Sequence, residues 1–194
     1  MTAYVALLFA VNVGGRKVPS TRLRALATRL GLAAPRTLVN SGNLVVAPGT
    51  SGATSRADVA RLVHDGVVDE FDVDATVVVL TTADLARIVA DVPFPTSARE
   101  DPAHLLVLVG ERPVDAAGVA ALDLSNAGRE RLAVAHDVLY ATFPDGIGRS
   151  RLTTTALSRA AGTPVTGRNW NTVTRLLELA RETEESAGAG TATP

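Results

Sequence analysis

Hydrophobic positions in the first fifty residues alternate between an apolar run, a helical repeat and a polar turn. Residues 3–9 form an apolar run typical of a buried strand. Leucines then recur at helical spacing between Pro19, which suits a helix start, and Gly31, which suits a helix end. Residues 36–39 and 44–47 lie on either side of a polar turn, and this pattern predicts a β-hairpin.

A second helix and a buried strand follow the hairpin. Apolar residues between positions 59 and 71 share one helical face, and Ser55 with Asp58 three residues later is typical of a capping box at the helix start. Residues 75–80 are apolar and predict a buried strand. The order βαββαβ predicts a ferredoxin-like sandwich for the first half of the chain.

The pattern begins again in the second half of the chain. A short helix over residues 83–89, with Thr81 and Asp84 as its capping box, closes the first half. The elements expected after it are a strand over residues 104–109, a helix over 115–122, strands over 131–134 and 138–142, a helix over 151–161 and a last helix over 170–181. The last helix takes the place of the strand that would complete a second copy.

The expected fold class is α+β, with a ferredoxin-like βαββαβ unit followed by a diverged βαββα repeat and a C-terminal helix. Three prolines between the halves predict a linker, and small residues late in the chain predict disorder. The expected domains are a ferredoxin-like subdomain with the short helix over residues 1–90, a Pro-rich linker over 91–102, a second α+β subdomain over 103–182 and a disordered tail over 183–194.

Composition limits the chemistry that the chain can perform. Of its 194 residues, 46% are hydrophobic, which is enough to bury a core. The absence of cysteine excludes disulfides, thiolate nucleophiles and zinc ribbons, and fits the reducing cytoplasm in which we expect this protein. The apolar run over residues 3–11 is shorter than the roughly 20 residues that a membrane span needs, so we expect no membrane partner.

Charge is informative in its distribution rather than in its total. The net charge of −1 does not favour a nucleic-acid partner, which usually requires a basic domain. Five arginines and no acidic residue occur between positions 146 and 177. The imbalance is modest, since 20 acidic residues among 194 would place about three in a stretch of this length.

Glycine, amide and arginine residues gather in four loops. Residues 143–152 and 167–172 stand at expected helix starts, where unpaired backbone donors and the helix dipole favour an anion. Residues 12–17 and 40–43 follow two strands that run parallel in a βαββ unit, so we expect these two loops to be neighbours. The candidate ligand-binding residues are Asn12, Gly14, Gly15, Arg16, Ser41, Gly42, Asn43, Asp145, Gly146, Gly148, Arg149, Ser150, Arg151, Arg168, Asn169 and Asn171.

Each motif also has a structural interpretation. Residues 146–150 suit a tight turn with Ser150 as an N-cap, and residues 41–43 suit a hairpin turn that needs unusual backbone angles. Trp170 shares helical spacing with later apolar residues and suits a core anchor. Asp145 is the best candidate for acid–base chemistry, with capping of the glycine turn as the alternative.

No complete catalytic or cofactor signature is present. His64, His104 and His136 lack the spacing of metal ligands, and neither Ser41 nor Ser150 can be paired with a base from sequence. The glycine turn lacks the third glycine of a dinucleotide fingerprint and the lysine of a P-loop. Whether the protein is an enzyme, and whether it uses a cofactor, stays open.

Four motifs form a recognisable set along the chain. They are residues 12–15 (NVGG), 41–43 (SGN), 144–152 (PDGIGRSRL) and 168–172 (RNWNT). This set resembles the DUF1697 family of bacterial proteins of unknown function, and the resemblance implies an α+β, ferredoxin-like duplication without a specific activity. The chain departs from the usual family pattern at Phe9 and Ala10, where members carry an arginine and a glycine, and at Asn40, where a glutamine is usual.

The sequence favours binding of a small anionic ligand, such as a nucleotide or a phosphorylated metabolite, at the glycine-rich loops. One alternative is an interaction module without a ligand, for which a homodimer is possible. The other is RNA or DNA binding, since ferredoxin-like sheets often present aromatic residues to RNA. Only 4% of the residues are aromatic, so a nucleic-acid partner is disfavoured.

Overall fold

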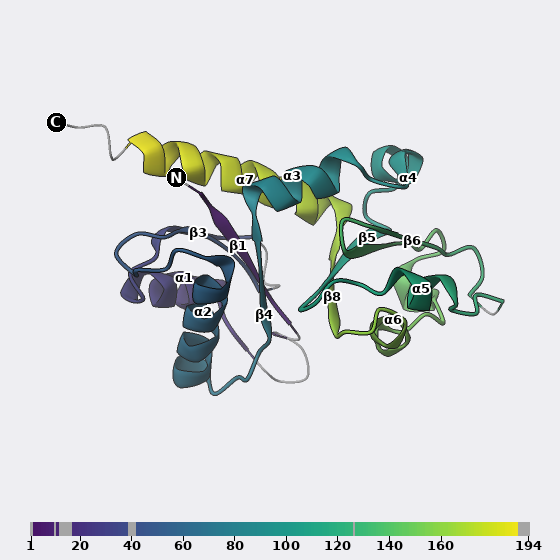
Figure 1. Ribbon diagram of the computed structural model, residues 1–194, viewed down its shortest axis with the longest axis horizontal. Coiled ribbons are helices and arrows are strands. Elements are labelled where there is room, and N and C mark those ends of the chain that lie inside the picture. The colour runs from purple at the N-terminus through teal and green to yellow at the C-terminus, as the bar shows by residue number, and fades with distance from the viewer. Residues whose placement is uncertain (1, 10, 12–16, 39–41, 126, 190–194) are drawn as a thin grey trace. The chain divides into compact units, whose positions relative to one another are not determined.

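The computed structural model divides into two compact units, each built around one four-stranded antiparallel sheet (Figure 1). The structure describes residues 2–9, 11, 17–38, 42–125 and 127–189. Unit 1 comprises residues 1–86 and 175–194, and unit 2 comprises residues 87–174.

Unit 1 contains the βαββαβ order expected from the sequence. Its strands lie in the order β2-β3-β1-β4, and each pairs with its neighbours in antiparallel orientation. Its elements are β1 (Tyr4–Leu8), α1 (Ser20–Arg29), β2 (Ala33–Thr37), β3 (Asn43–Ala47), α2 (Arg56–Phe71), β4 (Val77–Thr81) and the first half of α3 (Thr82–Ala90). Because β1 and β2 are both antiparallel to β3, they run parallel to each other, as expected.

The core of unit 1 lies between one face of the sheet and the helices α1 and α2. Alternate residues of β1, namely Tyr4, Ala6 and Leu8, face this core together with leucines of α1 and valines of α2. The predicted capping box at the start of α2 is confirmed. The Asp58 N–H donates to Ser55 Oγ (3.1 Å), and the Asp58 carboxylate accepts from the Ser55 N–H (3.0 Å).

The opposite face of the unit 1 sheet holds the later part of α7 (Trp170–Ala189). The strand register places Arg36 beside Val45, on the face that points away from α1 and α2. Arg36 forms an ion pair with Glu182 of α7. Glu184 Oε1 accepts hydrogen bonds from the Ala3 N–H (2.9 Å) and from the hydroxyl of Thr82, the first residue of α3 (2.8 Å). Unit 1 is therefore assembled from segments far apart in the sequence.

Unit 2 repeats the sheet with smaller helices. Its antiparallel strands lie in the order β6-β7-β5-β8. Its elements are the second half of α3, α4 (Pro95–Glu100), β5 (Leu105–Gly110), α5 (Ala116–Ala120), β6 (Arg131–Ala135), β7 (Val138–Thr142), the 3-10 helix η1 (Ile147–Arg149), α6 (Thr154–Ala160), β8 (Val165–Asn169) and the first turn of α7. The helices α5 and α6 have 5 and 7 residues, against 10 and 16 in α1 and α2, so the helical layer of unit 2 is smaller.

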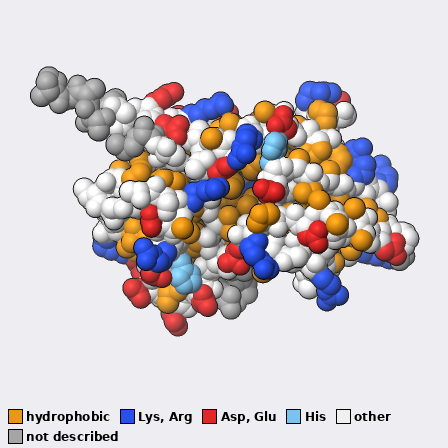
Figure 2. All heavy atoms as spheres, in the orientation of Figure 1, with side chains coloured by type: hydrophobic (Ala, Val, Ile, Leu, Met, Phe, Trp, Pro, Cys, Tyr) orange, Lys and Arg blue, Asp and Glu red, His pale blue; other side chains and the backbone are white. Residues whose placement is uncertain are grey.

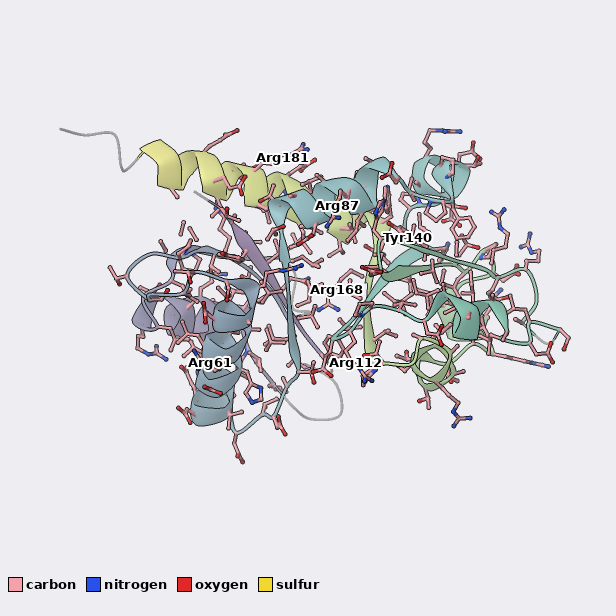
Figure 3. The ribbon with its side chains drawn as sticks, viewed as in Figure 1. Arg61, Arg87, Arg112, Tyr140, Arg168 and Arg181 are labelled. Atoms are coloured by element: carbon pink, nitrogen blue, oxygen red, sulfur yellow. The ribbon has the colours of Figure 1, made fainter. Side chains whose placement is uncertain are left out.

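Both faces of the unit 2 sheet are buried along its central strands. Leu108 faces the core formed with α5 and α6. Tyr140 and Arg168 lie on the other face, where both are in register with Val107 (Figure 3). The Tyr140 hydroxyl donates to the Ile88 carbonyl oxygen of α3 (2.9 Å), and burial raises the pKa of this phenol well above its ordinary range.

Three features of the structure differ from the expectations. β8 completes the second copy, and the last helix follows this strand instead of replacing it. Residues 91–102, expected as a linker, contain α4, with Pro95 at the first helical position, where its missing N–H costs nothing. The helix α7 continues to Ala189, whereas we expected a disordered tail from Thr183, whose side chain is buried and bonds the Leu179 carbonyl (2.8 Å).

The expected fold class is confirmed by the two sheets, which have the same strand order and the same connections. The capping box predicted for α3 is also present, since the Asp84 N–H donates to Thr81 Oγ1 (3.1 Å) and the Thr81 N–H donates to the Asp84 carboxylate (2.9 Å). Over the described part of the chain, no helix combines the length and apolar character needed to cross a bilayer.

Candidate functional site

Two of the four predicted loops meet at one end of the unit 2 sheet. The strands β7 and β8 lie on either side of β5 and both run antiparallel to it, so they finish at the same end. Thr142, the last residue of β7, is opposite Leu105, and Asn169, the last residue of β8, is opposite Leu106. The turn over residues 143–152 and the start of α7 leave the sheet here, at what we call the β7/β8 end.

The glycine turn after β7 uses several of its amides internally. The Gly146 N–H donates to the Phe143 carbonyl (2.8 Å), the Arg149 N–H to Gly146 (3.1 Å), and the Ser150 N–H to Ile147 (3.2 Å). The turn contains the short helix η1, and Gly146 has a positive φ of 90°. These three amides therefore stabilise the turn and are not directed at a ligand.

The tip of the turn is open to solvent. Ile147 is 45% exposed and is the large hydrophobic residue that stands out as exposed among those described. A Cβ built on Gly148 would meet nothing within 4 Å, and Gly148 is not among the residues with positive φ. The side chains of Arg149 and Arg151 are exposed beside it. The tip thus presents a glycine that the turn does not require, with two arginines next to it.

Ser150 closes the turn without capping the next helix. Its Oγ accepts a hydrogen bond from the Leu152 N–H (3.0 Å). The N-cap of α6 is Thr153, whose Oγ1 accepts from the Ala156 N–H (3.1 Å). The helix therefore starts three residues later than the sequence pattern indicates, and Ser150 keeps a local role in the turn.

Asp145 is held in an ion pair at the start of the turn. Its carboxylate accepts two hydrogen bonds from the Arg129 guanidinium, one of them at 3.0 Å. These bonds hold the pKa of Asp145 below its ordinary value, with a smaller contribution from Arg149. An ionised, arginine-paired carboxylate is poorly suited to exchanging protons near neutral pH. Pairing with Arg129 accounts for Asp145 better than acid–base chemistry does.

Arg168 lies on a sheet face and not in a loop. It is 8% exposed, and its Nη1 donates to Thr166 Oγ1 (2.9 Å) and to the Gly167 carbonyl (2.9 Å). Burial lowers the pKa of Arg168 to about 10, so the side chain still carries its charge near neutral pH. This placement gives Arg168 a structural environment different from that of the exposed Arg149 and Arg151.

The motif after β8 caps and anchors α7. Asn169 Oδ1 accepts a hydrogen bond from the Thr172 N–H (2.9 Å), which is the geometry of an N-cap. Trp170 is 7% exposed, as expected of a core anchor, and its backbone N–H donates to the Pro102 carbonyl (3.2 Å). Asn171 is exposed on the first turn of the helix. The exposed polar group that this motif contributes to the β7/β8 end is therefore Asn171.

The structure adds His104 to the β7/β8 end, a residue that the sequence patterns did not single out. His104 immediately precedes β5, between the ends of β7 and β8, and its carbonyl accepts from the Phe143 N–H (2.8 Å). Its Nδ1 lies 2.8 Å from Asp101 Oδ1. A Cβ built on Gly146 would lie 4.0 Å from its Nε2. An acidic residue three positions before a histidine, directly ahead of a strand, was the signal available in the sequence.

The candidate loops of unit 1 are only partly described. Asn12, Gly14, Gly15, Arg16 and Ser41 lie outside the described residues. The Leu8 N–H donates to the Gly42 carbonyl (2.8 Å), which joins the end of β1 to the start of β3.

The described members of the unit 1 loops have structural roles. Gly42 has a φ of 65°, and a Cβ there would collide with Val11. Asn43 is 1% exposed and its Nδ2 donates to the Leu38 carbonyl (3.0 Å). These contacts account for the glycine and the asparagine of the hairpin without a ligand.

Metal binding has no candidate centre in the part of the chain that the structure describes. No group of three or more His, Asp and Glu side chains is arranged there to hold a metal ion. The histidines lie instead in pairs with single carboxylates, as in His104 with Asp101 and His136 with Asp91 (2.7 Å).

Comparisons with known proteins give a family and a fold. A family described as "Protein of unknown function (DUF1697)" matches residues 1–140. The solved structure of the conserved bacterial protein SP0830 from Streptococcus pneumoniae is similar, with 21% sequence identity, a TM-score of 0.72, and coverage of 93% of this chain and 99% of that chain. No curated protein matches the chain. The family match ends before the turn after β7, so the β7/β8 end has to be interpreted from its own geometry.

Proposed function

The chain belongs to the DUF1697 family of proteins of unknown function, and from its own residues we propose that it binds a small anionic ligand at the β7/β8 end of unit 2. The ligand contacts the exposed Arg149 and Arg151, the tip of the turn at Gly148, and Asn171 at the start of α7. The observation that carries the proposal is the common end of β7 and β8, which brings the two motif loops together on either side of β5.

Charge supports an anion at this place. Arg149 and Arg151 are exposed, and the acidic residue of the turn, Asp145, is already paired with Arg129. Guanidinium groups bind phosphate and carboxylate oxygens through charge-assisted hydrogen bonds, which are stronger than bonds between neutral groups. The two arginines are therefore the main source of affinity in the proposal.

Backbone geometry at the tip supports a close approach. The amides of Ile147 and Gly148 have no acceptor among the described residues. Gly148 needs neither a positive φ nor a missing Cβ for the turn itself. Glycine commonly occurs where a ligand approaches the backbone closely, and such an approach would explain Gly148.

The test is a pair of matched double variants. Arg149→Ala with Arg151→Ala removes both exposed cations of the turn. Arg112→Ala with Arg159→Ala removes two exposed cations at the other end of the same sheet, where Arg112 bonds the Gly162 carbonyl (Figure 3). Both pairs change the net charge equally, so a difference between them reports the position of the anion.

Binding of pyrophosphate and of a nucleoside triphosphate is measured by isothermal titration calorimetry. We expect the Arg149 and Arg151 double variant to weaken binding by about tenfold or more, because two charge-assisted hydrogen bonds are lost. We expect the Arg112 and Arg159 variant to bind like the wild type. Equal losses in both variants, or no binding of either probe to the wild type, would contradict the proposal.

An interaction surface is the second candidate, and Ile147 favours it. An isoleucine 45% exposed at the tip of a turn is a suitable contact for another protein chain. If this is the function, the wild type forms a dimer in sedimentation experiments and Ile147→Ser is a monomer. A monomeric wild type at high concentration would remove the homodimer from consideration.

Nucleic-acid binding receives less support. All residues of the central strands β1 and β3 of unit 1 are buried, and so is Tyr140 in unit 2. These strands therefore lack the exposed aromatic side chains on which bases stack in ferredoxin-like RNA-binding domains. On the face shown in Figure 2, basic and acidic side chains are interspersed and form no continuous basic area.

A further inference from the structure

We infer that His104, oriented by Asp101, binds the anion at the β7/β8 end through its Nε2, and that the ligand class is a doubly charged oxyanion such as a phosphate monoester. The inference rests on the proposed function and adds a residue, a ligand class and a pH dependence to it.

The ring of His104 is oriented from one side. Asp101 follows α4, and its Oδ1 lies 2.8 Å from His104 Nδ1. A carboxylate at this distance accepts a hydrogen bond from the Nδ1–H group, so Nε2 is the ring nitrogen that can bind an external partner. No hydrogen bond to Nε2 is formed within the described residues. The pair thus has the arrangement by which proteins fix one ring nitrogen and present the other.

The backbone of His104 is fixed to both neighbouring segments. Its N–H donates to the Asp101 carbonyl (3.1 Å), and its own carbonyl accepts from the Phe143 N–H (2.8 Å) at the start of the glycine turn. The turn is therefore tied to the same residue that carries the ring. His104 and the turn form one local framework at the β7/β8 end.

The glycine turn passes close to Nε2 of the ring. A Cβ built on Gly146 would lie 4.0 Å from this atom, which is ordinary van der Waals contact. Gly146 also has a positive φ of 90°, so the turn itself favours glycine here. The side chains of His104 and Asp101 are 42% and 44% exposed, so the pair is open to solvent beside the glycine turn.

The neighbouring elements contribute charged groups of both signs. Asp101 comes from the end of α4, and Asp145, paired with Arg129, comes from the turn together with Arg149. The start of α7 contributes Asn169 and Asn171, which do not titrate.

A protonated imidazole at this end of the sheet adds one positive charge and one N–H donor to those of Arg149 and Arg151. A doubly charged tetrahedral oxyanion has enough oxygen atoms and enough charge to bind the side chains of His104, Arg149 and Arg151 together. A carboxylate, with two oxygen atoms and one charge, does not.

Sulfate is the probe that isolates the histidine, because sulfate keeps its double charge over the range in which histidine titrates. Histidine ordinarily gains its charge between about pH 8 and pH 5. We expect sulfate to bind about fivefold more tightly near pH 5.5 than near pH 8, at constant ionic strength, since a charge-assisted hydrogen bond is gained. Calorimetric titration across this range measures the effect.

Two variants compare His104 with another histidine of unit 2. His104→Asn is expected to bind sulfate with an affinity that does not change with pH. This affinity should equal the weaker one that the wild type shows near neutral pH and above. His136→Asn removes a histidine that is also paired with a single aspartate, Asp91, and is expected to keep the full pH dependence of the wild type. Loss of the pH dependence in His136→Asn alone would overturn the inference.

A measurement on the wild type avoids dependence on variant folding. The chain has three histidines, so their ring resonances are few and can be assigned by NMR. Sulfate is expected to shift the His104 ring resonances, and not those of His64 or His136. Sulfate binding with no response at His104 and no pH dependence would overturn this inference while leaving the arginine site intact. Failure of the wild type to bind sulfate or pyrophosphate at any pH would overturn both.

Discussion

The loops that follow β3 and β7 occupy equivalent places in the two sheets, yet the structure explains a glycine in the first loop and not one in the second. Gly49, after β3, has a φ of 58°, and a Cβ there would collide with the Gly31 carbonyl and lie 2.8 Å from the Ala33 nitrogen. Gly148, after β7, would place a Cβ in open space. Packing explains the first glycine and leaves the second unexplained. The comparison separates a glycine that the fold requires from one that the fold does not require.

The loop after β3 is also held more firmly by its surroundings than the loop after β7. The loop after β3 is held against the end of α1, where the Ser51 N–H donates to the Gly31 carbonyl (3.0 Å), and it leads into the 16-residue α2. The loop after β7 leads into a helix of 7 residues and exposes Ile147, Arg149 and Arg151. The duplicated fold has kept the loop of unit 1 as a structural connection and has left the loop of unit 2 open.

The largest expected effect breaks the structural loop. Gly49→Ala forces a Cβ against the backbone of Gly31 and of Ala33 in β2 at a left-handed φ, so we expect a loss of about 2 to 4 kcal/mol in the free energy of unfolding. Chemical denaturation followed by circular dichroism measures it. A stability within about 0.5 kcal/mol of the wild type would show that the two loops do not differ in this way.

The second effect compares two tyrosine hydrogen bonds, one in each unit. Tyr140→Phe removes the buried hydrogen bond to the Ile88 carbonyl, and we expect a loss of about 1 to 2 kcal/mol. Tyr4→Phe is the control in unit 1, because its hydroxyl bonds the Thr54 carbonyl in a half-buried position (3.1 Å) and should contribute less. Equal losses in the two variants would argue against the difference in burial.

Tyr140 also predicts a dependence on alkaline pH. Burial raises the pKa of its phenol above the ordinary value of 10.0, so the folded state retains this proton where the unfolded state has released it. The stabilisation from Tyr140 is therefore complete below pH 10 and declines as the pH rises above that value. Unfolding curves at increasing pH should show a smaller decline in Tyr140→Phe than in the wild type.

The third effect compares the helix caps that end the two loops. Ser55→Ala removes a reciprocal capping box from α2 and is expected to lower stability by about 1 kcal/mol. Thr153→Ala removes a single hydrogen bond from the shorter α6 and should cost less. The hydrogen bond from Ser55 lowers the pKa of Asp58, so this part of the stability is present above pH 3.8 and is lost as the pH falls below it. A difference between Ser55→Ala and wild type that stays constant in acid would contradict this assignment.

The smallest effect on stability is expected for Gly148→Ala, which also tests whether a ligand binds at the turn after β7. Gly148→Ala should change the free energy of unfolding by no more than about 0.5 kcal/mol, because the added Cβ meets no neighbour. If a ligand approaches the backbone at this point, the same variant binds pyrophosphate more weakly than the wild type. Unchanged affinity would leave the arginines as the binding groups and remove Gly148 from the site.

Local patterns in the sequence predicted much of the fold. The capping boxes at Ser55 and Thr81 were correct because both partners lie within four residues of each other. β8 was missed because its sequence carries one apolar residue, Val165, and forms a strand through pairing with β5. The helix α4 was missed because Pro95, which usually signals a loop, stands at the one turn of a helix that tolerates it.

The candidate site was less predictable than the fold. The turn after β7 and the start of α7 come to the same end because β7 and β8 both pair with β5, and these pairings join segments far apart in the sequence. Arg168 was grouped with the exposed arginines because its position on a strand, and hence its burial, depended on the same missed β8. The pairing of His104 with Asp101 needed the chain to turn between α4 and β5.

The contacts of Glu182 with Arg36 in β2 and of Glu184 with Ala3, just before β1, also constrain the order in which the protein matures during synthesis. The ribosome releases the first strands of unit 1 while residues 175–189 have yet to be translated, and the whole of unit 2 emerges in between. Unit 2 can complete its sheet as soon as β8 appears. Unit 1, which starts first, finishes last, and its uncovered sheet face is what a chaperone would have to protect in the meantime.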